Sequence, residues 1–101
     1  MRPLPIDIPR QAIAEFCRRH HIRRLALFGS VLRDDFRPDS DVDVLVEFEP
    51  GHTPGLAFID MRTELSKLLA RRVDLITEGF LSPYIRDNVR RTAEVVYADA
   101  G

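Results

Sequence analysis

The stretch from Leu25 to Phe48 reads LALFGSVLRDDFRPDSDVDVLVEF, and its pattern decides how the rest of the chain is interpreted. An apolar run ends at Gly29-Ser30, a polar segment follows, and a second run alternates charged and apolar residues from Asp41 onward. Alternation with a period of two is typical of a strand with one buried face. The stretch therefore predicts two strands joined by a turn, a short helical segment and a polar loop.

Two aspartates stand two residues apart where the second predicted strand begins. Residues i and i+2 of a strand share a face, so Asp41 and Asp43 are expected side by side, about 7 Å apart along the strand. The alternate residues, expected to point into a core, are Val42, Val44, Val46 and Phe48. Neighbouring carboxylates repel each other unless a cation lies between them, and Mg²⁺ accepts carboxylate oxygens while leaving places for substrate phosphates. The pair predicts a metal site, although Asp-x-Asp alone is also common on a solvated strand edge.

The Gly29-Ser30 turn offers a place for phosphate groups. Glycine lets the backbone approach a ligand closely. The start of the following helical segment presents free N–H groups and a positive dipole end, and Ser30 adds a hydroxyl. Gly-Ser by itself is also an ordinary turn. Together with the two aspartates it predicts a site for a nucleoside triphosphate.

At these residues the chain resembles a known family. Gly29-Ser30, ten intervening residues and Asp41-x-Asp43, with Arg33 inside the helical segment, resemble the minimal nucleotidyltransferases of the DNA polymerase beta superfamily. The resemblance extends over essentially the whole chain. The fold is expected to be α+β, with a small sheet carrying helices on one face; the resemblance implies that this is the nucleotidyltransferase fold and that its sheet is mixed and partly antiparallel.

The resemblance also implies a reaction, the metal-dependent transfer of a nucleotidyl group from a nucleoside triphosphate to a hydroxyl. It implies a third carboxylate on a neighbouring strand, and Asp74 in the predicted strand Val73–Thr77 fits that place; from the residues alone, Asp74 could equally be an edge residue. Two Mg²⁺ ions would stabilise the entering and leaving oxygens, and Asp74 would orient or deprotonate the acceptor. The expected catalytic and metal-binding residues are Asp41, Asp43 and Asp74, and the expected nucleotide-binding residues are Gly29, Ser30 and Arg33.

Small proteins of this family are typically encoded beside a HEPN-type ribonuclease toxin and act as its antitoxin. The resemblance therefore implies a protein adenylyltransferase that moves AMP from ATP to a tyrosine hydroxyl of that toxin. A second hypothesis is an antitoxin with an idle nucleotide site that inhibits by occlusion, which the intact motif disfavours. A third hypothesis, a transferase for a small molecule, is disfavoured because too little chain remains for a second substrate-binding domain.

The composition sets limits on the setting of this chemistry. A length of 101 residues predicts a single domain over residues 1–101. A net charge of −1 gives no general attraction to nucleic acid or anionic membranes. No apolar run approaches the roughly 20 residues that span a bilayer, and no signal peptide is evident, so a cytoplasmic location is expected. The segments Arg18–Arg24 and Arg86–Arg91 offer surface for a protein partner.

The remaining elements follow from periodicity and capping residues. Asp7 is expected to cap a helix that has Pro9 in its first turn and one apolar face made of Ile13, Phe16, Cys17 and His20. His20 and His21 diverge if both are helical, so they are not predicted to bind one metal. A second helix carries Phe58, Met61, Leu65, Leu68 and Leu69, and Arg71-Arg72 are expected to close it. Ser82-Pro83 begins a short helix, and Glu94–Tyr97 is the predicted last strand.

Overall fold

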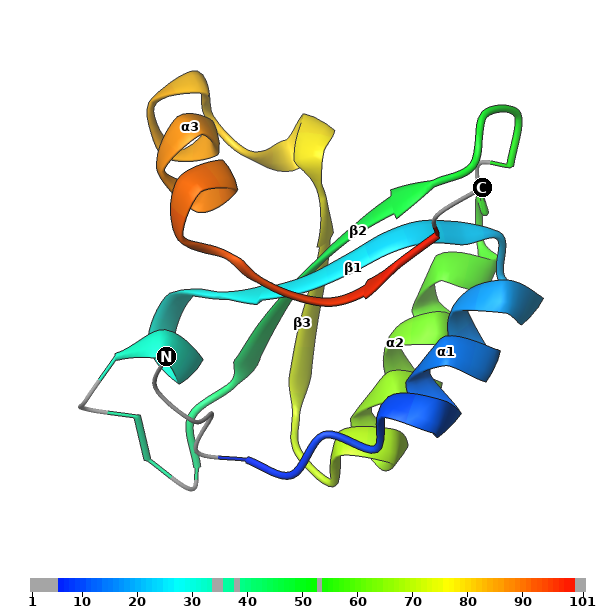
Figure 1. Cartoon of the computed structure of the whole chain (residues 1–101), viewed down its shortest axis with the longest axis horizontal. Coiled ribbons are helices and arrows are strands. Elements are labelled where there is room, and N and C mark those ends of the chain that lie inside the picture. The colour runs from blue at the N-terminus through cyan, green and yellow to red at the C-terminus, as the bar shows by residue number, and fades with distance from the viewer. Residues whose placement is uncertain (1–5, 34–35, 38, 53, 100–101) are drawn as a thin grey trace.

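The computed structural model describes residues 6–33, 36–37, 39–52 and 54–99, and of residue 80 the backbone only. The elements in chain order are α1 (Arg10–Arg19), β1 (Ile22–Phe28), the 3-10 turn η1 (Gly29–Leu32), β2 (Val42–Phe48), α2 (Ala57–Leu69), β3 (Val73–Thr77), the 3-10 turn η2 (Glu78–Phe80), α3 (Pro83–Thr92) and β4 (Glu94–Ala98). The predicted α+β class is confirmed (Figure 1). In the part of the chain that the structure describes, no helix is both long and apolar enough to cross a membrane.

The four strands form one mixed sheet in the order β3-β2-β1-β4. β1 runs antiparallel to both β2 and β4, whereas β2 and β3 are parallel. Phe28 at the end of β1 pairs with Asp43 of β2, and Asp43 pairs with Asp74 of β3. This register brings the end of β1 and the starts of β2 and β3 to the same end of the sheet.

Helices α1 and α2 cover one face of the sheet (Figure 1). The inward residues of β2 are buried as their alternation predicts, and Phe48 packs against the same core. Cys17 of α1 is a buried hydrophobe, and this burial raises the pKa of its thiol to about 12. The main core combines Ile13, Phe16 and Cys17 of α1 with Met61, Leu65 and Leu69 of α2 and with Val42, Val44 and Val46 of β2.

The opposite face of the sheet is covered at one end by α3. The expectation that the helices share one face is therefore correct for α1 and α2 but wrong for α3. The physical reason is that the other set of alternating strand residues is also apolar at this end. Phe28, Leu45 and Ile76 form a second cluster with Leu81 and Val89.

Helix α3 begins where the capping residues predict. Ser82 is its N-cap, and the Ser82 hydroxyl accepts a hydrogen bond from the Ile85 N–H at 3.4 Å. Pro83 occupies the first position of the helix, where its missing N–H costs nothing. Helix α2 ends earlier than expected, at Leu69, because Ala70 adopts a left-handed conformation with a φ of 54°. Arg71 and Arg72 therefore lie beyond the helix.

Candidate functional site

The candidate site lies where β1 ends and where β2 and β3 begin. Asp43 and Asp74 occupy paired positions on the adjacent parallel strands, which lie about 4.8 Å apart in a sheet. Their neighbours Val42, Val44 and Val73 are buried in the main core, so both aspartates point to the opposite face. The structure thus brings Asp74 beside Asp43, as the family resemblance implies. Asp41 precedes β2 instead of lying within it.

Gly29, the first residue of η1, makes room for one of these carboxylates. Its φ of +74° lies in the left-handed region that favours glycine. A Cβ added at this position would lie 2.3 Å from Oδ2 of Asp43. The sequence predicts that Gly29 lets a phosphate approach the backbone. Within the chain, the group that lies close to Gly29 is the Asp43 carboxylate.

Ser30 ties the turn to β2 through two hydrogen bonds. Its backbone N–H donates to the Asp43 carboxylate. Its hydroxyl donates to the carbonyl oxygen of Asp41 at 3.1 Å. Gly29, Ser30 and the two aspartates of the motif are therefore one connected unit, held together before any ligand is considered.

Asp43 is the electrostatic centre of this unit. Burial raises the pKa of its carboxyl, and the nearby charges of Asp74 and Asp41 raise it further. The N–H of Ser30 and the charge of Arg33 act in the opposite direction. A half-buried carboxylate with two acidic neighbours favours a bound cation, and an all-oxygen set of donors suits Mg²⁺. The residues present therefore fit a divalent ion held by Asp43 and Asp74.

Asp41 is engaged with an arginine that the sequence analysis assigned to the end of α2. Nε of Arg72 lies 3.0 Å from Oδ1 of Asp41, and Nη2 of Arg72 donates to the carbonyl of Asp39 at 3.3 Å. Within the described ranges, the ligand atoms of Asp41, Asp43 and Asp74 do not all lie within 4.8 Å of one another. Arg72 stands two residues before Asp74 and directly before β3, the strand that pairs with β2.

Two grooves lie at this end of the sheet. Gly29 and Arg33 line the first, together with the α3 residues Tyr84, Ile85, Asn88, Val89 and Thr92 and with Phe28 and Leu32. Asp41 and Asp74 line the second, together with Arg62, Thr63, Ser66, Arg72 and Val73. Nothing in the motif pointed to the polar residues of α2 and α3 that line these grooves. Four of the six residues expected from the sequence thus line the two grooves, Gly29 and Arg33 the first and Asp41 and Asp74 the second.

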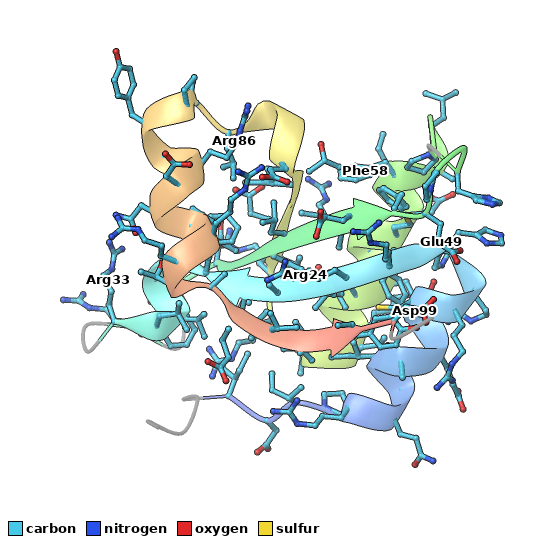
Figure 2. The ribbon with its side chains drawn as sticks, turned by 45° about the horizontal axis from the view of Figure 1, so that its top comes forward. Arg24, Arg33, Glu49, Phe58, Arg86 and Asp99 are labelled. Atoms are coloured by element: carbon cyan, nitrogen blue, oxygen red, sulfur yellow. The ribbon has the colours of Figure 1, made fainter. Side chains whose placement is uncertain are left out.

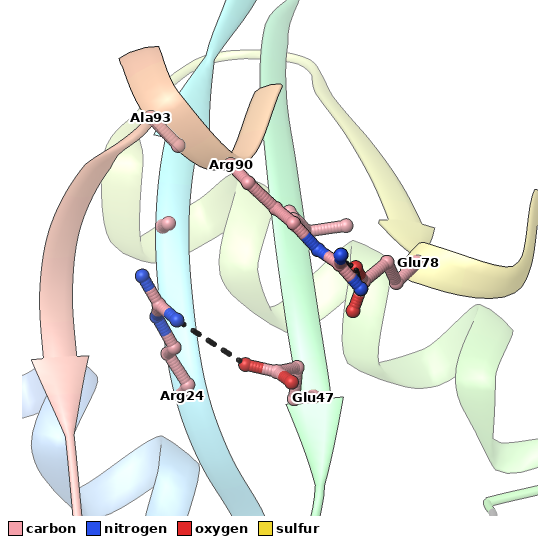
Figure 3. A pocket seen from close by; sticks show the side chains of 7 residues that line it. Arg24, Glu47, Glu78, Arg90 and Ala93 are labelled. Carbon is pink, nitrogen blue, oxygen red and sulfur yellow. Dashed lines mark hydrogen bonds and ion pairs between the residues drawn. The ribbon is translucent and has the colours of Figure 1, made fainter. Parts of the chain in front are cut away.

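A third cavity, of about 220 Å³, lies farther along the same face of the sheet as Asp43 (Figure 3). Its walls carry two ion pairs, Arg24 with Glu47 at 3.7 Å and Arg90 with Glu78. Arg19 is paired with Glu64 in the same way. Three arginines of the segments expected to face a partner are therefore already paired within the chain.

The raised pKa of Asp43 predicts a pH-dependent stability. In EDTA, the wild type is expected to lose stability relative to Asp43→Asn as the pH rises from about 4, the ordinary pKa range of aspartate. The folded chain holds the Asp43 proton more tightly than the unfolded chain, so ionisation lowers the free energy of unfolding. Thermal melts of both proteins from acid to neutral pH measure the difference, which added Mg²⁺ should reduce. Equal stability differences at every pH would contradict the prediction.

The chain is similar to known proteins in both sequence and fold. The model of the nucleotidyltransferase domain matches residues 9–96. The protein adenylyltransferase MntA of Thermococcus cleftensis is 42% identical over 84 residues, covering 82% of this chain and 81% of the relative. A solved structure assigned as a minimal nucleotidyltransferase has a TM-score of 0.69 and 43% identity, covering 83% of this chain and 85% of that one. A tri-AMPylated HEPN toxin of Shewanella oneidensis in complex with MNT antitoxin gives a match in fold, with a TM-score of 0.64, 18% identity, and coverage of 89% and 70%.

Proposed function

Because this chain belongs to the nucleotidyltransferase domain family, we propose that it is a Mg²⁺-dependent protein adenylyltransferase that transfers AMP from ATP to a tyrosine hydroxyl of a HEPN-type ribonuclease toxin. In doing so it acts as the antitoxin. The relative MntA is named for adenylyl transfer to protein, and one fold match comes from a complex in which a HEPN toxin carries AMP. These names support adenosine as the nucleoside and a HEPN protein as the acceptor.

One observation carries the proposal: the paired position of Asp43 and Asp74 directly beside the Gly29-Ser30 turn. Adjacent carboxylates on neighbouring strands are unfavourable for the folded chain alone. Asp74 lines one groove, and Gly29, whose added Cβ would meet Asp43, lines the other, which is consistent with a role toward a ligand. Asp43 and Asp74 would hold Mg²⁺, and Asp41 would become a further ligand if its carboxylate left Arg72. The metal would neutralise the negative charge of the phosphates.

The residues of the chain have separate roles in this proposal. Gly29 and the first turn of η1 receive the β and γ phosphates, and Arg33 in the same groove neutralises their charge. The acceptor oxygen forms a bond to the α-phosphorus, the bond from that phosphorus to the bridging oxygen breaks, and pyrophosphate leaves. Asp74 accepts the proton of the acceptor hydroxyl. A tyrosine suits this role because the ordinary pKa of its phenolic hydroxyl is about 10. Loss of that proton leaves a phenolate oxygen that can act as the nucleophile.

The acceptor side of the site is open, which supports a macromolecular acceptor. Asp41 and Asp74 are exposed, and Tyr84 and Ile85 on the rim of the α3 groove are exposed as well. A partner that covers this end of the sheet would bring its own hydroxyl to Asp74. An AMP group attached near the active site of a ribonuclease would repel RNA phosphates and block their access.

Intact-mass spectrometry tests the proposal. The purified chain is mixed with the HEPN-type protein encoded beside it, Mg²⁺ and each nucleoside triphosphate in turn. We expect mass additions of AMP size on the partner with ATP, lost when the acceptor tyrosine is changed to phenylalanine and lost in EDTA. A partner that stays unmodified yet is fully inhibited, even by the Asp41→Asn, Asp43→Asn double variant, would leave occlusion as the better account.

A further inference from the structure

A cluster of two histidines and one glutamate lies at the opposite end of the sheet from the candidate active site. His21, Glu49 and His52 each offer one ligand atom, and these atoms all lie within 4.8 Å of one another. Nδ1 of His21 is 3.2 Å from Oε2 of Glu49. Figure 2 shows Glu49 and Arg33 at opposite ends of the sheet, in keeping with the pairing of Ile22 with Phe48 and of Phe28 with Asp43.

The backbone holds the three residues of this cluster in place. The Glu49 N–H donates to the His21 carbonyl at 2.8 Å, and the His52 N–H donates to the Glu49 carbonyl at 3.0 Å. Between Glu49 and His52 stand Pro50 and Gly51, whose φ of +84° gives the features of a type II turn. The turn returns His52 to the side of His21, and the two imidazole rings stack with centroids 3.9 Å apart.

The backbone of His21 ends α1, since His21 follows the C-cap residue His20 in the left-handed conformation that is common at this position. Its φ of 57° is a left-handed conformation, which is uncommon for a residue other than glycine. Neighbouring His20 turns away to Glu64, with Nε2 of His20 3.0 Å from Oε1 of Glu64. The two adjacent histidines therefore serve different partners, as their predicted divergence requires. His21 instead meets a residue 31 positions later in the chain, which no local spacing could reveal.

From this geometry we infer that His21, Glu49 and His52 bind one Zn²⁺ ion within a single chain. Two imidazoles and one carboxylate are a donor set typical of zinc, and tetrahedral coordination at about 2.0–2.1 Å places ligand atoms roughly 3.3 Å apart. The His21–Glu49 separation already has this value. His52 must rotate out of the ring stack, because the lone pair of an imidazole lies in the plane of its ring. Both histidines are exposed, so this rotation meets little resistance.

Calorimetric titration of untagged, EDTA-treated protein with ZnCl₂ tests the inference. The chain has three histidines, so single variants test all of them. Beyond any Zn²⁺ held by Asp43 and Asp74, we expect one ion per chain for the wild type and for His20→Ala, the matched control. Asparagine is chosen at position 21 because it tolerates the left-handed region. His52→Ala and His21→Asn should each weaken Zn²⁺ binding by at least about tenfold. This is the smallest effect reported for losing a group that only supports a metal ligand, and a ligand itself should matter more.

Two further measurements keep this inference distinct from the proposed function. Zn²⁺ should raise the melting temperature of the wild type and of His20→Ala by more than that of His52→Ala. Adenylyl transfer in Mg²⁺ alone should be unchanged in His52→Ala, because the cluster lies away from Asp43. Absence of saturable Zn²⁺ binding, equal weakening by His20→Ala, or one ion bound between two chains would overturn the inference.

Discussion

Replacing Asp43 by asparagine is expected to reduce adenylyl transfer by about a thousandfold or more, because a metal contributes several kcal/mol of charge stabilisation and each ~1.4 kcal/mol is a factor of ten. Asparagine keeps the size of the side chain and can still accept the hydrogen bond from the Ser30 N–H. It removes the negative charge on which the metal site depends. Affinity for Mg²⁺-ATP, measured by calorimetry, should fall with activity.

The same substitution is expected to stabilise the protein in the absence of divalent ions. Burial and the charge of Asp74 raise the pKa of Asp43, so its ionised form opposes folding at neutral pH, and asparagine removes this cost. A loss of activity together with a gain in melting temperature separates a site residue from a structural one. Asp60→Asn on the exposed side of α2 is the matched control and should leave both activity and affinity unchanged. Unaltered Mg²⁺-ATP affinity and transfer in Asp43→Asn would show that the metal assignment is wrong.

Gly29→Ala is the second substitution with a large expected effect. A methyl group at Gly29 would lie 2.3 Å from Oδ2 of Asp43, whereas ordinary contacts to a Cβ begin at 3.4 Å. The carboxylate must therefore move by about 1 Å, a displacement that costs on the order of a hundredfold in rate when it affects a catalytic group. The left-handed backbone adds about 1–2 kcal/mol of instability for any residue with a Cβ. Steady-state transfer and thermal melts measure the two effects separately.

Gly55 provides the control for backbone strain. Its φ is also positive, at +61°, and an added Cβ would meet no atom within 4 Å. Gly55→Ala should therefore lose similar stability and keep its activity. Ser30→Ala removes a hydrogen bond to the Asp41 carbonyl, worth about 1 kcal/mol, and should reduce transfer less than Gly29→Ala. If Gly29→Ala and Gly55→Ala retained equal activity, the turn would be merely a structural element.

Much of the fold could be predicted because local patterns and packing agree. The strand Val73–Thr77 and the cap at Ser82 are found where apolar runs and capping residues place them. Every second residue of β2 from Val42 to Val46 is buried, because one face of the strand packs against the main core. The mixed sheet was not derivable from the residues, since the order of elements suggested alternating βα units. It followed from the resemblance to a family and is confirmed.

What could not be predicted depends on contacts between distant segments. The ion pair of Arg72 with Asp41 forms only because β3 lies beside β2. The local sequence around Arg72 predicts instead a cation at the end of a helix. The placement of α3 depends on apolar residues of three strands that meet only in the folded sheet. The functional roles of Gly29, Ser30, Arg33 and the three aspartates remain predictions, and the substitutions above test those of Gly29, Ser30, Asp41 and Asp43. The structure adds a physical reason for Gly29 that the motif did not contain.

The parallel pairing of β2 with β3 has a consequence for how the chain folds. Strands β1 and β2 are consecutive strands with no longer helix than η1 described between them, whereas β3 can join them only after the chain has crossed through α2. Such non-local pairing carries a larger entropic cost and tends to form late. It is also the pairing in which the carboxylates of Asp43 and Asp74 meet. Like-charge repulsion therefore opposes this step of sheet assembly, and a divalent cation that relieves the repulsion would favour the native sheet as well as the chemistry.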